Sequence, residues 1–443
     1  MQNQQMTMTD VLGLGFMTFA FFLGAGNLIF PPLAGYLAGE HMPLAMAGFL
    51  FTAVGMPLIA LIAVAKAKGK IMALLPVFAA TVLAIAIYII IGPAFAAPRT
   101  GLVAYEIGAK PFLTDTSAAV VFAGQTLNLS RLLYTCAFFA ITMLLALFPG
   151  KLLDNVGKLL TPVLLLLLMA LACSVIILPG AAVGLPVSDY ENSPLIKGVL
   201  EGYNTMDTLA SLMFGVLIID ILRKKGIHQA KAQTRYLIQA AIIAAAGLAF
   251  VYISLFYLGA TAGELAQGAE NGGEILTNYV TKHFGTAGIV LLATVVTLAC
   301  LTTAVGLVSA CSEYFNELLP RISYKLFVVI FSFICGVVAN VGLSQLIQIS
   351  IPVLYTVYPV AIALVMVTFL TERFARPAMS HRLTLSVALI FGLLDGLKAA
   401  GVDMSMFDFM PLYTEGMAWL IPTLVSILFC FTLREKPVAV LSS

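Results

Sequence analysis

The chain has 443 residues, of which 61% are hydrophobic and only 10% are charged, and its mean hydropathy is +1.04. A soluble protein of this length needs more charge to cover its surface, so the composition indicates a protein that lies in lipid. The formal net charge of +2 is too small to indicate a nucleic acid or an acidic partner. The six cysteines lie in apolar runs without a CxxC pair, which argues against a disulfide framework or a zinc site.

Apolar runs recur along the whole chain. A membrane-spanning helix needs about 20 mostly apolar residues, and no cleavable signal peptide precedes the first run. About twelve segments are predicted, near 9–38, 42–65, 72–104, 131–148, 155–178, 195–222, 231–260, 285–312, 323–340, 345–370, 383–400 and 415–433. The third is too long for a straight span, and Pro93 and Pro98 are the places where we expect a kink. We expect an all-α polytopic membrane protein with one domain over residues 1–443.

The first segment contains residues that interrupt helices. The run Gly24-Ala25-Gly26-Asn27 lies in its middle, and Pro31-Pro32 follows. Glycine permits backbone conformations outside the helix, and proline removes an N–H donor. A broken helix at membrane depth persists only where its free backbone groups face a cavity or a ligand. The plainer alternative is that the glycines merely allow close helix packing.

The sixth segment carries the polar run Tyr203-Asn204-Thr205-Met206-Asp207 where the middle of the bilayer is expected. Interrupted segments at matching positions of two halves are typical of inverted-repeat transporters. This predicts two five-helix repeats, approximately 9–178 and 195–370, with extra helices over 383–433. Asp207 itself has three open roles: partner of a substrate amino group, proton carrier, or N-cap of the half-helix that follows.

The two interruptions suit an amino acid. Free N–H groups at the start of a helix carry partial positive charge, so Ala25, Gly26 and Asn27 are candidates to hold a carboxylate. Carbonyls released from the preceding half-helix are candidates to bind a small cation. The amino group of the substrate would face carbonyl ends around the sixth segment, with Asp207 as an additional partner.

Basic residues set the orientation. With a cytoplasmic amino terminus and alternating segments, only six of the 23 lysines and arginines fall on the outer side: Arg99, Lys110, Arg131, Lys197, Lys282 and Lys398. The excess of basic residues on the inner side predicts that both termini are cytoplasmic.

Four stretches resemble one family. These are GFMTFAFFLGAGNLIFPPLAGYLAGE at Gly15–Glu40, IGPAFAAPRTGLVAYEIG at Ile91–Gly108, EGYNTMDTLASLMFG at Glu201–Gly215 and CLTTAVGLVSACSEYF at Cys300–Phe315. They are similar to the bacterial branched-chain amino acid:cation symporters, which have the leucine-transporter fold. The resemblance implies sodium-coupled uptake of leucine, isoleucine and valine across a bacterial inner membrane, with segments one and six discontinuous.

The resemblance also implies functional residues. Substrate would contact the unwound stretch Gly24, Ala25, Gly26 and Asn27, together with Tyr203, Asn204, Thr205, Met206 and Asp207. Sodium would bind the carbonyls of Ala20, Leu23 and Ala299 and the hydroxyls of Thr302 and Thr303, because an alkali cation requires oxygen ligands. The plainer alternative for the two threonines is a hydrogen bond to the preceding helical turn.

Two further charges and several alternatives remain. Arg99 is a candidate to pair with Glu106 in an outer gate, although a side chain that reaches up to the interface is an equal alternative. The histidines form no ligand cluster and no GxxxxGK[ST] run occurs, so neither an enzyme nor an ATP-driven pump is expected. The alternatives are a proton-coupled symporter, a symporter of another small neutral amino acid, and a membrane receptor that does not transport. Apart from Na⁺ as coupling ion no cofactor is expected, and besides substrate and lipid no obligatory protein partner.

Overall fold

A computed structural model describes residues 6–113, 118–122, 125–148, 161–178 and 181–433. Nearly all regular structure in this part of the chain is helical. The α-helices are α1 (Met8–Phe22), α2 (Ala25–Ala38), α3 (Met42–Leu50), α4 (Met56–Lys66), α5 (Val77–Ile89), α6 (Ala96–Gly108), α7 (Leu129–Ala146), α9 (Thr161–Ile177), α10 (Pro194–Tyr203), α11 (Asp207–Lys224), α12 (Ala230–Ala260), α13 (Gly272–Leu318), α14 (Tyr324–Val338), α15 (Leu343–Leu370), α16 (Pro377–Ala399) and α17 (Leu420–Thr432).

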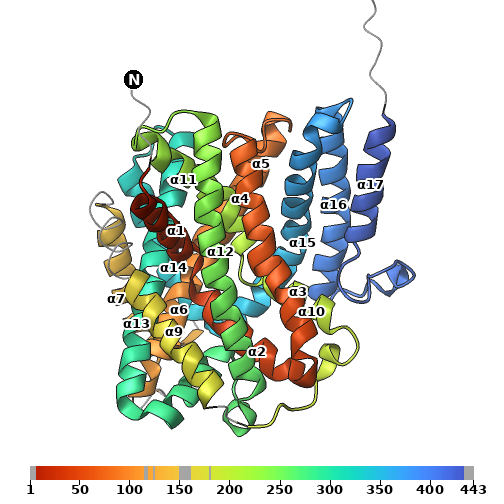
Figure 1. Ribbon diagram of the computed structural model, residues 1–443. Helices are drawn as coiled ribbons and strands as arrows, with labels where there is room; N and C mark the ends of the chain where they lie inside the picture. Colours follow the sequence, from red (N-terminus) through yellow and green to blue (C-terminus); the bar gives the residue numbers. More distant parts are fainter. Residues whose placement is uncertain (1–5, 114–117, 123–124, 149–160, 179–180, 434–443) are drawn as a thin grey trace, which may run out of the picture.

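Eight helical stretches in the described residues are long and apolar enough to cross a membrane, or nine if the bent pair α10–α11 counts as one. α1 begins and α17 ends at the same end of the bundle (Figure 1). The sequence analysis did not anticipate the short hairpin of β1 (Ala119–Phe122) and β2 (Gln125–Asn128), which pairs Ala119 with Asn128. The start of the fifth predicted segment, 155–160, lies outside the described residues.

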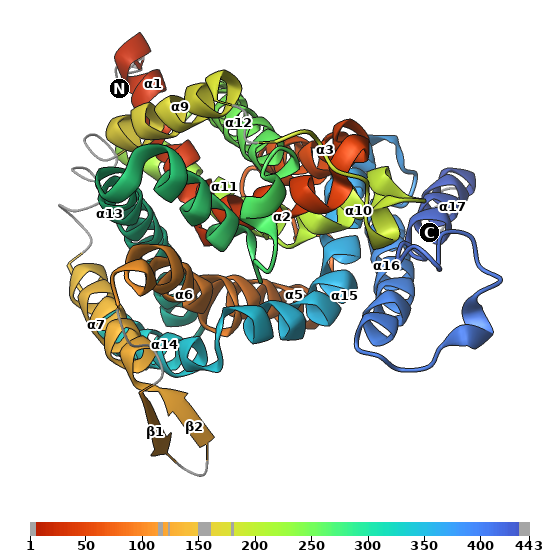
Figure 2. The same cartoon turned by 90° about the horizontal axis from the view of Figure 1, so that it is seen from below.

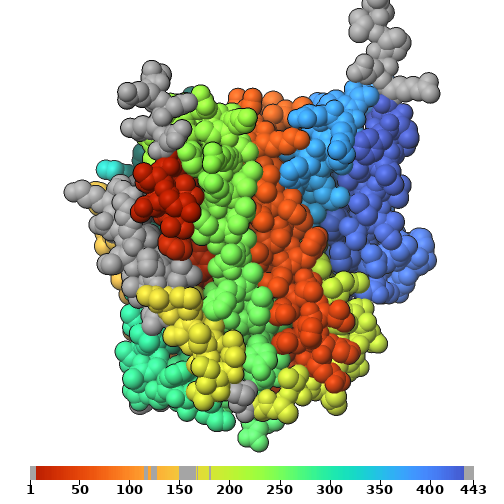
Figure 3. Space-filling view, in the orientation of Figure 1, coloured from red at the N-terminus to blue at the C-terminus, as the bar shows by residue number. Residues whose placement is uncertain are grey.

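The buried centre of the bundle contains the interrupted helices. α2 and α11 lie inside a ring that includes α12, α13, α6, α5, α15 and α3 (Figure 2). α16 and α17 form a pair at one edge, and α12 runs the full height of one outer face (Figure 3). Outer helices expose large apolar side chains, such as Phe333 on α14 and Leu428 on α17. Such side chains suit contact with lipid, whereas polar groups gather at the centre.

Glycines bring backbones together at two places around this centre. A methyl group on Gly35 of α2 would clash with the carbonyl of Phe256 on α12, and one on Gly259 would clash with Pro32. A methyl group on Gly198 of α10 would likewise clash with Ala45 on α3. Small residues allow helices in a membrane to pack at backbone distance. The closest packing therefore fixes both half-helices that flank the polar centre.

Of the prolines that the sequence singled out, only Pro93 lies at a break in a helix. Pro31 and Pro32 lie inside α2, which continues through both of them to Ala38. The third predicted segment is kinked at Gly92 (φ −83°, ψ −118°), within a π-helical turn that contains Pro93. Pro98 lies in the first turn of α6, where a missing N–H donor costs no helical hydrogen bond. The kink therefore belongs to Pro93 and its neighbour, and Pro98 does not contribute a second one.

Candidate functional site

The chain leaves helical geometry between α1 and α2. Leu23 has φ −70° and ψ 83°, and Gly24 is extended with φ −110° and ψ −167°. In a continuous helix the Gly24 N–H would donate to the Ala20 carbonyl. Here it donates instead to Phe22 O (2.7 Å) and to Asn27 Oδ1 (2.9 Å). The Ala20 carbonyl therefore lacks the hydrogen bond from Gly24 that a continuous helix would give it. The first amides of α2 likewise have no acceptor within the helix.

A second break separates α10 from α11, whose axes differ by 43°. Met206 has the left-handed backbone conformation, φ 65° and ψ 11°, which is uncommon for a residue with a side chain. Strain of this kind tends to lie at ligand sites. Thr205 accepts a hydrogen bond from the Asp207 amide at 3.3 Å. The N-cap of α11 is Met206 and has no side-chain hydrogen bond, so Asp207 does not act as the cap.

Asp207 instead joins the two breaks. Its Oδ2 accepts hydrogen bonds from Asn27 Nδ2 (2.8 Å) and from the Tyr252 hydroxyl (2.9 Å). Asn27 also contacts the Tyr252 hydroxyl, and all three side chains are buried. Among the described residues no lysine or arginine lies within 4.0 Å of this carboxylate. A buried carboxylate without a cationic partner is costly in a membrane, which marks it as a functional group.

Tyr252 is a member of this cluster that sequence reasoning missed. It lies on α12 within an otherwise ordinary apolar helix, and its ring packs edge-on against Phe49 at 5.2 Å. Only its placement opposite Asp207 marks it as functional. The sequence signal was one of several hydroxyl side chains in a long and mostly apolar helix, which does not distinguish a site residue from an interfacial tyrosine.

Arg99 lies near the same two breaks. It is 2% exposed, and its guanidinium donates to the Asn204 carbonyl (2.6 Å) and to Ser350 Oγ on α15 (3.1 Å). The Phe30 ring lies 5.2 Å below it. Neither sequence-based alternative is correct, because Arg99 neither pairs with Glu106 nor reaches the interface. Because α6 packs against α2 in this orientation, the Arg99 side chain points into the bundle, away from both Glu106 and the interface.

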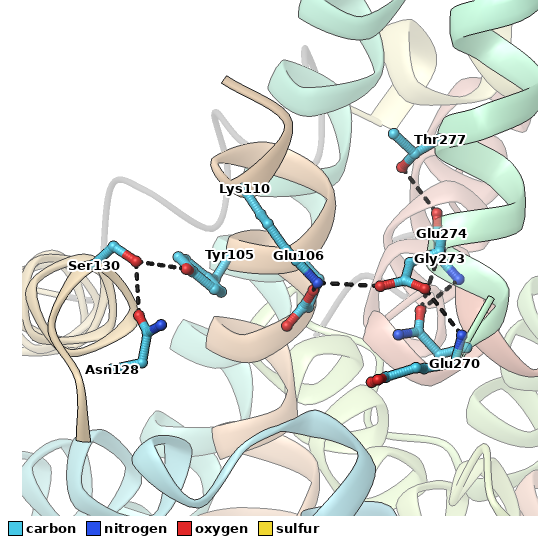
Figure 4. A network of polar contacts seen from close by, with 10 residues as sticks. Tyr105, Glu106, Lys110, Asn128, Ser130, Glu270, Gly273, Glu274 and Thr277 are labelled. Atoms are coloured by element: carbon cyan, nitrogen blue, oxygen red, sulfur yellow. Dashed lines mark hydrogen bonds and ion pairs between the residues drawn. The ribbon is translucent and has the colours of Figure 1, made fainter. Parts of the chain in front are cut away.

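Glu106 belongs to a separate cluster at the C-terminal end of α6 (Figure 4). Lys110 Nζ lies 2.7 Å from Glu106 and 3.1 Å from Glu274 at the start of α13. The Tyr105 hydroxyl lies 2.7 Å from Ser130 Oγ on α7. The three charged side chains are partly exposed, so their ion pairs are screened and contribute little energy individually. Together these contacts hold the end of α6 against the starts of α7 and α13.

The predicted cation ligands come together only in part. Thr303 Oγ1 donates to the Leu23 carbonyl at 3.3 Å, so α13 contacts the broken end of α1. Thr302 Oγ1 donates to Ala299 O at 2.9 Å, as in the plainer alternative. A hydroxyl that donates its hydrogen still has lone pairs for a cation. Thr303 and Leu23 are therefore the best-placed oxygens of the predicted set, with Ala20 on the same broken turn.

One small cavity of about 40 Å³ lies between the two breaks. Its lining includes Gly24, Ala25, Gly26, Asn27, Thr205, Met206, Asp207, Arg99 and Thr303. This space is close to the volume of a water molecule, so a ligand as large as an amino acid would enter only if the lining helices moved apart. Tyr203 and Asn204 are not among the lining residues. Tyr203 stacks on Tyr358 at 4.3 Å, and the Asn204 side chain donates to Glu201 at 3.0 Å.

Apolar residues that sequence reasoning did not single out complete the cavity wall. They are Phe21, Phe22, Ile91, Ala96, Ala210, Phe214 and Leu307. Phe214 stacks on Phe21 at 5.1 Å and meets Phe22 edge-on at 5.5 Å. The cavity therefore has an apolar wall beside the Arg99 guanidinium, the Asp207 carboxylate and the amides at the start of α2.

Known proteins share both the sequence and the fold. Residues 7–436 match the family described as "Branched-chain amino acid transport protein". The "Branched-chain amino acid transport system 2 carrier protein" of Pseudomonas aeruginosa is 45% identical over 437 residues, which cover 97% of each chain. "Branched-chain amino acid permease BrnQ" of Escherichia coli is 41% identical over 96% of this chain and 95% of its own. The crystal structure of MhsT in complex with L-phenylalanine matches with a TM-score of 0.54 and 16% identity, covering 97% of this chain and 99% of that one.

Proposed function

This chain belongs to the branched-chain amino acid transport protein family, and we propose that it takes up leucine, isoleucine and valine together with sodium. Its relatives are named carriers and permeases, so it is a transport protein and not an enzyme. The observation that carries the proposal is the Asn27–Asp207 hydrogen bond, which brings the two helix breaks around one cavity.

The proposed arrangement in the membrane has twelve spans. α1–α2 and α10–α11 form discontinuous spans one and six, and two inverted repeats over about 9–178 and 195–370 precede the extra helices α16 and α17. The protein would lie in a bacterial inner membrane with both termini on the cytoplasmic side. Supporting this topology, α1 begins and α17 ends at one end of the bundle (Figure 1). The ion pairs Lys225–Asp10 (3.6 Å) and Lys66–Glu372 (3.7 Å) join helix ends and loops at the side that the basic-residue bias assigns to the cytoplasm.

The substrate would bind with its carboxylate at the start of α2. The free amides of Ala25 and Gly26 carry partial positive charge there. Its ammonium group would face Asp207, and its side chain would pack against the phenylalanines Phe21 and Phe214. A single methylene in an apolar pocket discriminates by only about 1–3 kcal/mol, so all three branched-chain amino acids are accepted with modest preference.

Sodium would bind at the broken end of α1. Its ligands are the carbonyls of Ala20, Leu23 and Ala299 and the hydroxyls of Thr302 and Thr303. Support comes from the Thr303–Leu23 contact and from the rerouted Gly24 amide. One inward cation gains about 2.3 kcal/mol per 100 mV. A tenfold ion gradient adds about 1.4 kcal/mol, so one sodium suffices for concentrative uptake of a zwitterion.

A proton-coupled symporter is the second candidate, because Asp207 is a buried carboxylate without a cationic partner among the described residues. The test is uptake of labelled leucine into proteoliposomes that contain only this protein. We expect concentrative uptake under an inward sodium gradient, with competition by isoleucine and valine. Uptake that ignores sodium but follows an inward proton gradient would favour the second candidate. Leucine binding without any flux would indicate a receptor. Uptake of another neutral amino acid, with no uptake of leucine, would contradict the proposal that branched-chain amino acids are the substrates.

A further inference from the structure

Among the described residues, Arg99 is the only arginine or lysine that lines the cavity between the two breaks. Among the described residues no carboxylate lies within 4.0 Å of its guanidinium. Its partners are neutral, namely the Asn204 carbonyl and the Ser350 hydroxyl. Its Nε is buried and has no hydrogen-bond partner. A buried charge with an unpaired donor is strongly unfavourable unless an anion completes the site.

The geometry points to where that anion would lie. A side chain on Gly26 would begin 3.5 Å from Arg99 Nη1 and 3.5 Å from the Asn204 carbonyl. Since residue 26 has no side chain, the guanidinium and the first turn of α2 face the same space. The amides at that helix start also favour an anion. Two independent positive features thus converge on one side of the cavity.

We propose that Arg99 binds the carboxylate of the transported amino acid directly, beside the amides of α2, and so makes a free carboxylate obligatory for binding. This inference rests on the proposed function and adds a specificity-determining residue to it. The guanidinium presents planar donors that match a carboxylate, whereas the amides alone supply only partial charge. Asp207 lines the same cavity and supplies the opposite charge, so the site is complementary to a zwitterion.

The consequence is rejection of analogues that lack one charge. A site that pairs a buried charge with its ligand leaves that charge unpaired when an uncharged analogue binds. Leucinamide keeps the side chain and the ammonium group of leucine but replaces the carboxylate by a neutral amide. It is therefore the probe that isolates the contribution of Arg99. The competing account is that Arg99 only ties α6 to α10 and α15.

The experiment measures ligand-induced thermal stabilisation of the purified full-length protein in sodium, with leucine and leucinamide each titrated. The wild type should bind leucinamide at least about 100-fold more weakly than leucine. R99Q should weaken leucine binding about 10- to 100-fold and change leucinamide binding by less than about threefold. The matched control is R131Q, because Arg131 also donates to a helix-end carbonyl, Asn340 O at 2.7 Å, but does not line the cavity. R131Q should keep the wild-type ratio.

Two results would overturn the assignment. In one, R99Q keeps the wild-type preference for leucine over leucinamide. In the other, R99Q lowers the affinity for both ligands equally. If R99Q is not monodisperse, R99K decides, because lysine keeps the charge without the planar fork. R99K should weaken leucine binding about tenfold and still bind leucine more tightly than leucinamide. An equal loss of affinity for both ligands would again overturn the assignment. A wild type that leucine does not stabilise would contradict the proposed function instead.

Discussion

Asn27 donates a 2.8 Å hydrogen bond to Asp207 across 180 residues of sequence, and this contact joins the break between α1 and α2 to the break between α10 and α11. The same Asn27 caps the Gly24 amide at 2.9 Å. One side chain therefore contacts both the open end of α2 and Asp207, the only acidic residue among the described residues that line the cavity. We expect a change at either break to affect the other partly through this buried contact.

Replacing Asp207 should impair substrate binding. D207N keeps the size of the side chain and removes the negative charge that faces the substrate ammonium group. We expect leucine binding to weaken about 10- to 100-fold, the range for loss of a charge-assisted hydrogen bond. D220N on the same helix is the control, since Asp220 pairs with Arg223 at the exposed end of α11 and should bind leucine as the wild type does. Unchanged binding in D207N would rule out the ammonium role.

Replacing Thr303 should impair sodium coupling. T303V removes the hydroxyl that contacts the Leu23 carbonyl and keeps the branched shape. The sodium concentration for half-maximal leucine uptake should rise at least about tenfold. T294V, on the same helix with a hydroxyl bonded to its own backbone at 2.8 Å, should leave that concentration unchanged. Equal sodium dependence in T303V and T294V would exclude Thr303 as a ligand.

Removing the Tyr252 hydroxyl should weaken the cluster without abolishing it. Y252F deletes the 2.9 Å hydrogen bond to Asp207, which keeps its bond to Asn27. A net hydrogen bond contributes about 0.5–1.5 kcal/mol, so leucine affinity should fall about 3- to 10-fold. Y257F, on the same helix and outside the cavity lining, should have wild-type affinity. If both variants behave alike, Tyr252 has no part in the site.

Adding one methyl group where α2 meets α12 should destabilise the fold. G35A places a carbon against the Phe256 carbonyl, and overpacking of this kind costs about 1–3 kcal/mol. The measurement is the thermal midpoint of unfolding in detergent. G13A, at an exposed position of α1 with open space around it, should unfold at or above the wild-type temperature. An unchanged midpoint for G35A would contradict the backbone contact between the two helices.

Much of the architecture follows from local sequence. Apolar runs must be helical in lipid because no water satisfies their backbone groups. The first break falls at Leu23 and Gly24, at the start of the glycine-containing run where the sequence predicts it. Partners across the bundle do not follow from such patterns. Arg99, Tyr252 and Thr303 have the side-chain directions that helix packing imposes, and a one-residue rotation of α6 would direct Arg99 elsewhere. Pro31 and Pro32 proved compatible with a continuous α2, since tertiary packing outweighs the loss of their donors.

The most direct test of coupling between leucine transport and sodium is leucine-driven sodium entry. Proteoliposomes that contain only the wild-type protein would start with equal sodium on both sides, and an inward leucine gradient would be imposed while radioactive sodium influx is measured. We predict that leucine stimulates sodium influx, that valine does the same, and that T303V loses the stimulation while T294V keeps it. Leucine entry that leaves sodium influx unchanged would contradict sodium coupling through this site.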